Sequence, residues 1–170
     1  FAHSGQFIKA AKAGKHIFIE KPIALTTDVG KEMVKAARET RVVTQVGFHM
    51  RWSAAVRKLI TLIKSGATGR PVLFSGQYQC NSLHTPWWIN VNLGGGQIFE
   101  QAIYIYDMCR YLIGHPKFAC GIMGNVCHNH IYDYTIEDVS ASFAGFTNGA
   151  ISSITATNCA VPGLWEAKFT

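Results

Sequence analysis

Apolar residues recur along the chain at two spacings, one typical of helices and one typical of strands. Where they fall three and four residues apart they form one face of a helix, and where they run together or alternate over a few residues they indicate a strand. The first segment with helical spacing begins at Ser4 or Gly5 and ends at Gly14, and the second begins at Thr27 or Asp28. The third runs from Val56 to Ile63 and ends near Gly66, and the fourth follows the three glycines 94–96 and reaches Leu112. The predicted strands are 17–19, 41–46, 72–80, 117–123, 138–146 and 150–158, with a last one beginning at Trp165.

The order of these elements predicts two kinds of domain. Before residue 50, a helix is followed by a strand, a helix and a strand, which is the β-α-β unit of a doubly wound parallel domain. The continuous apolar run Ile17-Phe18-Ile19 is typical of a strand buried on both faces of such a sheet. Later strands are joined by tight turns such as Asn148-Gly149, which predict antiparallel pairing. We therefore expect an α/β domain over 1–50 and, over 51–170, an α+β domain whose open, mostly antiparallel sheet has helices on one face.

Composition excludes several classes of protein. The 170 residues are 48% hydrophobic and 15% charged, which is typical of globular domains that bury a core. No apolar run approaches the roughly 18 residues that cross a bilayer, so we expect no membrane partner. The formal net charge is +6, but the Lys and Arg residues are dispersed at helical spacings. This pattern favours solvated helix faces over a nucleic-acid surface.

The five cysteines are an odd number and form no C-x-x-C pair. They indicate reduced thiols in the core or strands of a cytoplasmic protein. The run Cys127-His128-Asn129-His130 crowds candidate ligands into four residues and fits no usual zinc spacing, so no metal site is predicted. The cysteines are Cys80, Cys109, Cys120, Cys127 and Cys159.

The segment from Gly94 to Asp107 combines a glycine triplet with an amphipathic helix. Residues three and four apart share a helix face, so Glu100, Tyr104 and Asp107 form a titratable side. Such a helix can present an acid and a phenol to a cleft, and the glycines would let a backbone or ligand approach its N-terminus. A buried tyrosine beside a solvated carboxylate explains the pattern equally well. The apolar stripe of the same helix is Ile98, Ala102, Ile105, Cys109 and Leu112.

Glu20, Lys21 and Pro22 follow the first predicted strand at its carboxyl end. Ligands of open α/β sheets bind outside the carboxyl ends of the strands, and a following proline restricts the backbone, so Lys21 is a candidate site residue. Alone, the three residues are a weak signal, because surface turns often contain the same residue types.

The joint pattern is more specific than either motif. Gly14-Lys15-His16, the strand that follows with its E-K-P, and the glycine-led helix much later in the chain resemble the Gfo/Idh/MocA family of nicotinamide-dependent oxidoreductases. His3, Arg51 and Asn148-Gly149-Ala150 also lie where that family's pattern places them. The resemblance covers essentially the whole chain. It implies a fragment that lacks the start of a Rossmann domain and the end of a C-terminal α/β domain.

The resemblance implies NAD or NADP as the cofactor. In the family, the lysine of E-K-P lies beside the nicotinamide and its ribose and helps the proton transfer, a role that falls to Lys21. Glu20, Pro22 and His3 are the further cofactor-binding residues that it implies. The family's helix usually carries an aspartate and, four residues on, a histidine that acts as acid and base. This chain has Glu100 and Tyr104 at those places.

Tyrosine in place of histidine alters the expected chemistry. An unperturbed phenol has a pKa of about 10, against about 6.5 for imidazole, and a neighbouring ammonium such as that of Lys21 would lower it. We therefore expect an NAD(P)-dependent oxidoreductase acting on a sugar, a polyol or a related hydroxy or keto compound, in which Tyr104 and Lys21 handle the proton and Glu100 orients a hydroxyl. Arg51 is expected to hold a carboxylate or a substrate oxygen, and Trp87 to bind the substrate.

Two rival interpretations remain. In the first, the chain belongs to a non-catalytic relative that binds cofactor or metabolite, and the histidine-to-tyrosine change marks lost turnover. In the second, it is a basic scaffold or nucleic-acid module, which predicts salt-sensitive binding to polyanions. The family resemblance also implies a homo-oligomer that associates through the open sheet face, and we expect the fragment by itself to be inactive. His16 and His49 are expected to be structural.

Overall fold

A computed structural model describes residues 4–83 and 85–170. The chain divides into two compact units, Phe1–Phe48 and His49–Thr170, each with its own hydrophobic core. Within the described part of the chain, no helix has the length and apolar character that crossing a membrane requires.

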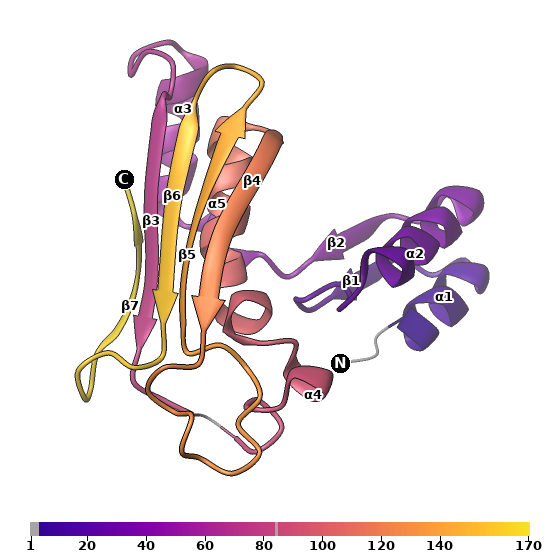
Figure 1. Ribbon diagram of the computed structural model, residues 1–170. Coiled ribbons are helices and arrows are strands. Elements are labelled where there is room, and N and C mark those ends of the chain that lie inside the picture. The colour runs from indigo at the N-terminus through magenta and orange to yellow at the C-terminus, as the bar shows by residue number, and fades with distance from the viewer. Residues whose placement is uncertain (1–3, 84) are drawn as a thin grey trace. The chain divides into compact units, whose positions relative to one another are not determined.

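The first unit is the predicted β-α-β arrangement preceded by a helix (Figure 1). Its two short strands pair in parallel, with Ile17 opposite Thr44 and Ile19 opposite Val46. A helix that connects two parallel strands is the usual crossover of doubly wound domains. The elements are α1 (Ser4–Lys12), β1 (Ile17–Ile19), α2 (Thr27–Thr40) and β2 (Thr44–Val46).

Local chemistry sets the ends of these elements and corrects two predictions. Gly14 has the predicted left-handed conformation after α1, with φ of +68°. The cap of α2 is Thr26, whose hydroxyl accepts a hydrogen bond from the Val29 N–H at 3.4 Å, and not Thr27 or Asp28. Arg41, predicted as the first residue of the second strand, instead caps α2 in the left-handed region with φ of +56°. The strand β2 therefore begins only at Thr44.

The prediction that β1 is buried on both faces is wrong for the described chain. Ile19 is buried against Phe7 of α1 and Met33 of α2, but the Phe18 side chain is 66% exposed. Side chains alternate along a strand, and both helices pack on the face that Ile17 and Ile19 share. The opposite face, which carries Phe18, has no such cover.

The second unit is a five-stranded sheet with helices on one face, as predicted (Figure 1). The strand order is β4-β5-β6-β3-β7, and every neighbouring pair is antiparallel except β3 and β6. Its strands are β3 (Leu73–Cys80), β4 (Pro116–Gly124), β5 (Val139–Phe146), β6 (Ile151–Thr157) and β7 (Trp165–Phe169). Its helical elements are the 3-10 helix η1 (His49–Trp52), α3 (Ala54–Lys64), α4 (Val91–Gly94), the π-helical turn η2 (Ile98–Ala102) and α5 (Ile103–Ile113).

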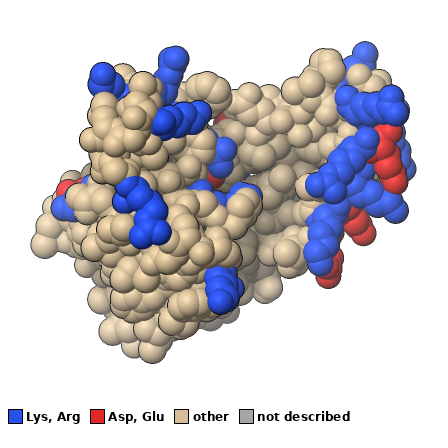
Figure 2. Space-filling view, turned by 90° about the horizontal axis from the view of Figure 1, so that it is seen from above, with Lys and Arg blue, Asp and Glu red and all other residues tan. Residues whose placement is uncertain are grey.

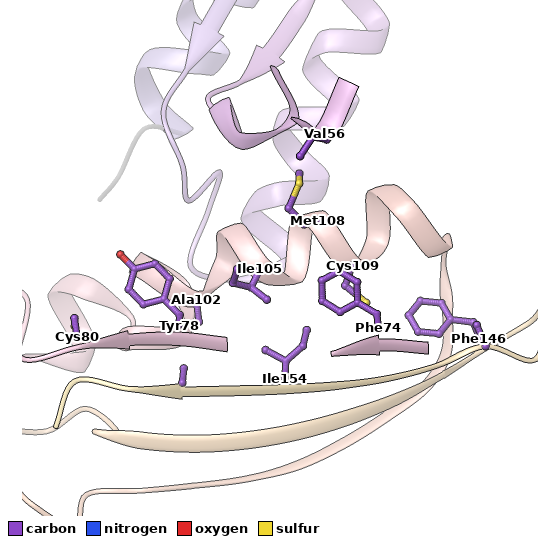
Figure 3. Packing of buried hydrophobic residues seen from close by; sticks show 12 residues of the cluster. Val56, Phe74, Tyr78, Cys80, Ala102, Ile105, Met108, Cys109, Phe146 and Ile154 are labelled. Carbon is purple, nitrogen blue, oxygen red and sulfur yellow. The ribbon is translucent and has the colours of Figure 1, made fainter. Parts of the chain in front are cut away.

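The core of this unit lies between the sheet and α5 (Figure 3). Ile105 and Cys109 of α5 point towards Phe74 and Ile154 of the sheet, while Met108 points away towards Val56 of α3. The apolar stripe predicted for the segment is thus the face of α5 that covers the sheet. Burying a large apolar side chain stabilises the fold by about 1.5–3 kcal/mol, so this layer holds α5 firmly in place.

The other face of the sheet is open. Nearly every residue of β4 is exposed, and so is Phe143 of β5. Helices on one face and alternating burial along β3 and β6 agree with the predicted open sheet. Large exposed apolar residues on this face include Phe118, Ile122, Phe143, Ile151 and Leu73.

In Figure 2, Lys and Arg side chains gather with acidic ones over the part at the right of the view and are scattered singly over the rest. On α2 of the first unit, basic and acidic residues are interspersed, and Lys31 pairs with Asp28 at 3.3 Å. Lys35 lies 3.9 Å from Glu39 on the same helix. Exposed pairs at these spacings contribute at most about 0.5 kcal/mol, and they are the pattern of a solvated helix face.

Candidate active site

The glycine triplet separates two helical elements, so the helical segment with Glu100 and Tyr104 begins after the glycines, as predicted. The short helix α4 ends at Gly94, and Gly95 caps it in the left-handed region with φ of +79°. Gly96 follows with φ of +103°, a conformation that stops a helix from continuing. The chain then forms the π-helical turn η2, which carries Glu100, and continues as α5 with Tyr104. Single π turns of this kind are frequent at functional sites.

A carboxylate from the β4–β5 connection caps η2. Glu137 Oε1 accepts a hydrogen bond from the Ile98 N–H at 2.7 Å, which places negative charge at the start of the helical segment. Burial raises the pKa of Glu137, and hydrogen bonds from the backbone oppose that rise. The Glu137 carboxylate also occupies the space where a Cβ on Gly96 would lie. Gly96 thus makes room for a protein carboxylate.

Gly96→Ala is expected to destabilise the protein by about 1–3 kcal/mol. Alanine is strained at φ of +103°, and its Cβ would displace the Glu137 carboxylate from the Ile98 N–H. Thermal unfolding of the complete protein measures the loss. Gly66→Ala is the matched control, because Gly66 has φ of +76° but no atom within 4 Å of an added Cβ. Equal losses for the two variants would show that the Glu137 contact adds nothing.

The predicted titratable side of the helix faces η1 and β3. The Tyr104 ring packs edge-on against His49, with ring centroids 4.8 Å apart. Burial raises the pKa of Tyr78 on β3 to about 12, and Glu100 and Tyr104 both add to that rise by their charge. The charges of Glu100 and Tyr104 therefore both act on the Tyr78 phenol. The Tyr78 hydroxyl accepts a hydrogen bond from Trp165 Nε1 at 2.8 Å, which orients it.

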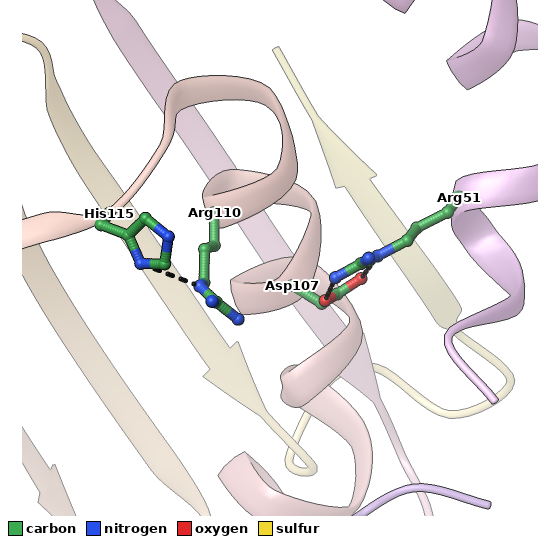
Figure 4. Close-up of polar contacts among 4 residues, drawn as sticks. All are labelled: Arg51, Asp107, Arg110 and His115. Carbon is green, nitrogen blue, oxygen red and sulfur yellow. Dashed lines mark hydrogen bonds and ion pairs between the residues drawn. The ribbon is translucent and has the colours of Figure 1, made fainter. Parts of the chain in front are cut away.

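Asp107, one turn beyond Tyr104, pairs with Arg51 of η1 (Figure 4). The guanidinium donates from Nε to Asp107 Oδ2 at 2.7 Å and from Nη2 to Oδ1, which is the two-point geometry of a strong pair. It also lies over the Tyr111 ring, with Cζ 4.7 Å from the centroid. Arg51 thus holds a carboxylate of its own unit. Its predicted contact with a substrate oxygen stays a prediction.

Tyr106 points elsewhere, as expected of a residue two positions from Tyr104. Its hydroxyl lies 2.8 Å from Ser142 Oγ on β5, beneath the helix. Burial raises the pKa of the Tyr106 phenol, which suits a neutral structural hydroxyl.

The two tryptophans before α4 have different environments. Trp88 is 1% exposed and packs in a small core with Tyr134 and Ile136. Trp87 is 38% exposed and lies against Gly94. Of the two, only Trp87 keeps ring surface that a ligand could contact.

The E-K-P residues lie in the first unit, directly after β1. A Cβ added to Gly47 would lie 2.7 Å from Glu20 Oε2, so the carboxylate of Glu20 rests against the backbone that follows β2. Lys21 precedes the buried Pro22 through a cis peptide bond. His16 is structural as expected, because its Nδ1 accepts the Val43 N–H at 3.0 Å. His3 lies outside the described residues, and the meeting of Lys21 with Tyr104 in one cleft stays a prediction.

Two family patterns match the chain in succession. Residues 1–48 match an oxidoreductase family with an NAD-binding Rossmann fold, and residues 56–169 match the GFO/IDH/MocA C-terminal domain. The chain belongs to the Gfo/Idh/MocA family of oxidoreductases. The predicted family, fold class and nicotinamide cofactor are therefore confirmed at the level of the family.

Two of the relatives that the chain resembles are named as dehydrogenases. The chain is 30% identical to scyllo-inositol 2-dehydrogenase (NAD(+)) of Bacillus subtilis over 156 residues, which are 91% of this chain and 45% of the relative. It is 36% identical to levoglucosan dehydrogenase of Pseudarthrobacter phenanthrenivorans over 118 residues, which are 66% of this chain and 30% of the relative. The chain thus spans less than half the length of these relatives.

One solved structure is similar to nearly the whole chain. Levoglucosan dehydrogenase in complex with NADH and levoglucosan superposes with a TM-score of 0.90 and 29% sequence identity, over 98% of this chain and 48% of that one.

Proposed function

We propose that the complete protein is an NAD(P)-dependent dehydrogenase that oxidises a carbinol of a cyclic sugar or polyol, with Tyr104 as the acid and base. The observation that carries this proposal is the placement of Tyr104. Its ring is packed against His49, and its charge, like that of Glu100, acts on Tyr78. A half-buried phenol on a helix fixed by the core is a suitable site for proton transfer.

The first unit offers groups that fit part of a nicotinamide nucleotide. Glu20 lies against the backbone at Gly47, and Lys21 is the second residue after β1, so a carboxylate and an ammonium belong to the segment at the carboxyl ends of parallel strands. A ribose requires both kinds of group. The bound nicotinamide ring would supply the hydride acceptor, and the residues of this chain would control the proton and the position of the substrate.

The proton steps follow from the groups that the chain provides. The substrate hydroxyl gives its proton to the Tyr104 oxygen as its carbon is oxidised, and the Lys21 ammonium favours the phenolate form that accepts it. Glu100 accepts a hydrogen bond from a neighbouring substrate hydroxyl and so fixes which carbon reacts. Trp87 offers its exposed ring to the C–H face of a sugar, and Arg51, already paired with Asp107, steadies the helix that carries Tyr104.

The named relatives support the substrate class. An inositol and an anhydrosugar, the compounds in the names of two relatives, are both rings with several hydroxyl groups. The structure with levoglucosan and NADH, 29% identical to this chain, supports the same class. An enzyme of this kind would work in the cytoplasm as a homo-oligomer, and the exposed apolar side chains near the open sheet face support association there.

Turnover by the complete gene product tests the proposal. The purified protein is incubated with NAD+ or NADP+ and a panel of inositols, anhydrosugars, open-chain polyols and aldoses, and reduced nicotinamide is followed by its absorbance. We expect turnover with at least one cyclic polyol and none with a hydroxyl-free ring of the same size. Cofactor binding by calorimetry, with no turnover on any member of the panel, would instead support the non-catalytic relative.

A further inference from the structure

Two connections at one end of the open sheet bring together three groups that are far apart in sequence. Cys127 lies in the β4–β5 connection, Asp138 immediately precedes β5, and Cys159 follows β6. One ligand atom from each, two sulfurs and a carboxylate oxygen, lies within 4.8 Å of the other two. None of these residues belongs to the proposed active site.

Asp138 is held as a buried anion. Its side chain is fully buried, and Oδ2 accepts the Cys127 N–H at 2.7 Å and the His128 N–H at 2.8 Å. Burial would raise the pKa of Asp138, but the N–H groups of Val126, His128 and Cys127 together lower it. Within residues 4–83 and 85–170, Val126 is the one residue that donates to Oδ1, at 2.8 Å. A carboxylate oxygen has room for a second partner, so Oδ1 can also bind a cation.

The two thiols lie near this carboxylate and interact with each other. Cys159 Sγ donates weakly to the Asp138 carbonyl at 3.7 Å and to Asn158 Oδ1 at 3.5 Å, while its backbone N–H is fixed by Thr157 Oγ1 at 2.9 Å. Cys127 is exposed, so an ion and its water can reach the group from solvent. Two soft sulfur ligands with one carboxylate are a set that zinc and cadmium prefer over magnesium or calcium.

We propose that Cys127, Cys159 and Asp138 form a binding site for a thiophilic divalent cation of the zinc type, with water as the fourth ligand. Zinc–sulfur bonds of about 2.3 Å in a tetrahedron place two sulfurs about 3.8 Å apart. The two sulfurs, which lie within 4.8 Å of each other, need to approach by about 1 Å at most, and rotation of the exposed Cys127 side chain can provide this movement. Binding releases the proton of each thiol and forms two metal–thiolate bonds, with no change of oxidation state.

The fold explains why the sequence did not predict this site. The local run Cys127-His128-Asn129-His130 has no zinc spacing, and only the pairing of β5 with β6 brings Cys159 to Cys127. A bound ion would fasten the β4–β5 connection to the end of β6. Glu137, the cap of η2, precedes Asp138 in that connection. Metal binding at Asp138 would therefore also stabilise the segment that carries Glu100.

The test is metal titration of the complete, reduced protein after chelator treatment. Cadmium is added under an inert atmosphere, and thiolate-to-metal charge-transfer absorption reports sulfur ligation. We expect one saturable site and a higher melting temperature with zinc. Cys127→Ser and Cys159→Ser should each weaken binding by roughly 100-fold or more, since each removes one of three protein ligands.

Cys120→Ser is the matched control, because Cys120 is an exposed thiol on β4 outside the group. Circular dichroism verifies that every variant is folded, and Cys127→Ala, at an exposed position, provides a second measure free of a residual hydroxyl. Unchanged cadmium binding in both Cys127 variants would overturn the proposal. So would the absence of saturable binding, or formation of a Cys127–Cys159 disulfide that cadmium does not prevent.

Discussion

Replacing Tyr104 with phenylalanine is expected to lower kcat of the complete enzyme by roughly 10²- to 10⁴-fold, the usual contribution of a general acid and base. The variant keeps the ring that packs against His49 and loses only the hydroxyl that takes the substrate proton. Affinity for the nicotinamide nucleotide should stay unchanged, since that contact is assigned to the first unit. Steady-state kinetics and nucleotide titration measure the two quantities separately.

Two further variants sharpen this prediction. Tyr106→Phe should leave kcat within a factor of about two, because the Tyr106 hydroxyl is engaged with Ser142 beneath the helix. Tyr104→His restores the residue usual in the family. The rate of oxidation should rise with pH as the base loses its proton, and imidazole has a lower intrinsic pKa than phenol, about 6.5 against about 10, so this rise should move to lower pH. A Tyr104→Phe enzyme with undiminished kcat would rule out proton transfer at this position.

Arg51→Met is expected to cost about 3 kcal/mol of unfolding free energy, the loss that follows when one partner of a buried ion pair is removed. The Asp107 side chain is only 5% exposed and would keep its carboxylate in the helix face without the guanidinium. Because 32% of the Arg51 side chain is exposed, we expect a loss of unfolding free energy at the lower end of the range usual for broken buried ion pairs. Denaturant unfolding of the complete protein measures the change.

A double variant separates the pair from its surroundings. Arg51→Met combined with Asp107→Leu removes both charges, and two apolar groups of similar volume should recover most of the lost stability. If the double variant is as unstable as Arg51→Met alone, packing of the arginine over Tyr111 dominates over the ion pair.

The elements with a clear period were predictable because local chemistry decides them. The helix α3 was predictable because its apolar residues, beginning with Val56, recur at helical spacing and pack on the core. The β5–β6 turn was predictable from Asn148-Gly149, because Gly149 has φ of +83° and Asn148 Oδ1 accepts the Ala150 N–H. The face shared by Tyr104 and Asp107 was predictable for the same reason, since both residues meet η1.

The remaining features depend on contacts between distant segments. Glu137 caps a segment that begins 39 residues earlier, and nothing in its own neighbourhood marks it as a cap. The glycines predict space for a backbone or a ligand, whereas the Glu137 carboxylate fills the space beside Gly96. Sequence alone does not reveal which group fills such a space. The exposed face of β1 was missed because a continuous apolar run does not show on which side the helices pack.

The π-helical turn has a consequence for how this site could change during evolution or design. A wide turn takes up more chain than an α-helical one, so deleting a single residue between Ile98 and Ala102 would let regular winding continue into α5. Because the wide turn absorbs the extra residue, the segments before and after it would keep the faces that they present, and Tyr104 would keep its contact with His49. The turn thus lets the chain carry one residue more between the glycine triplet and Tyr104 without rotating either segment.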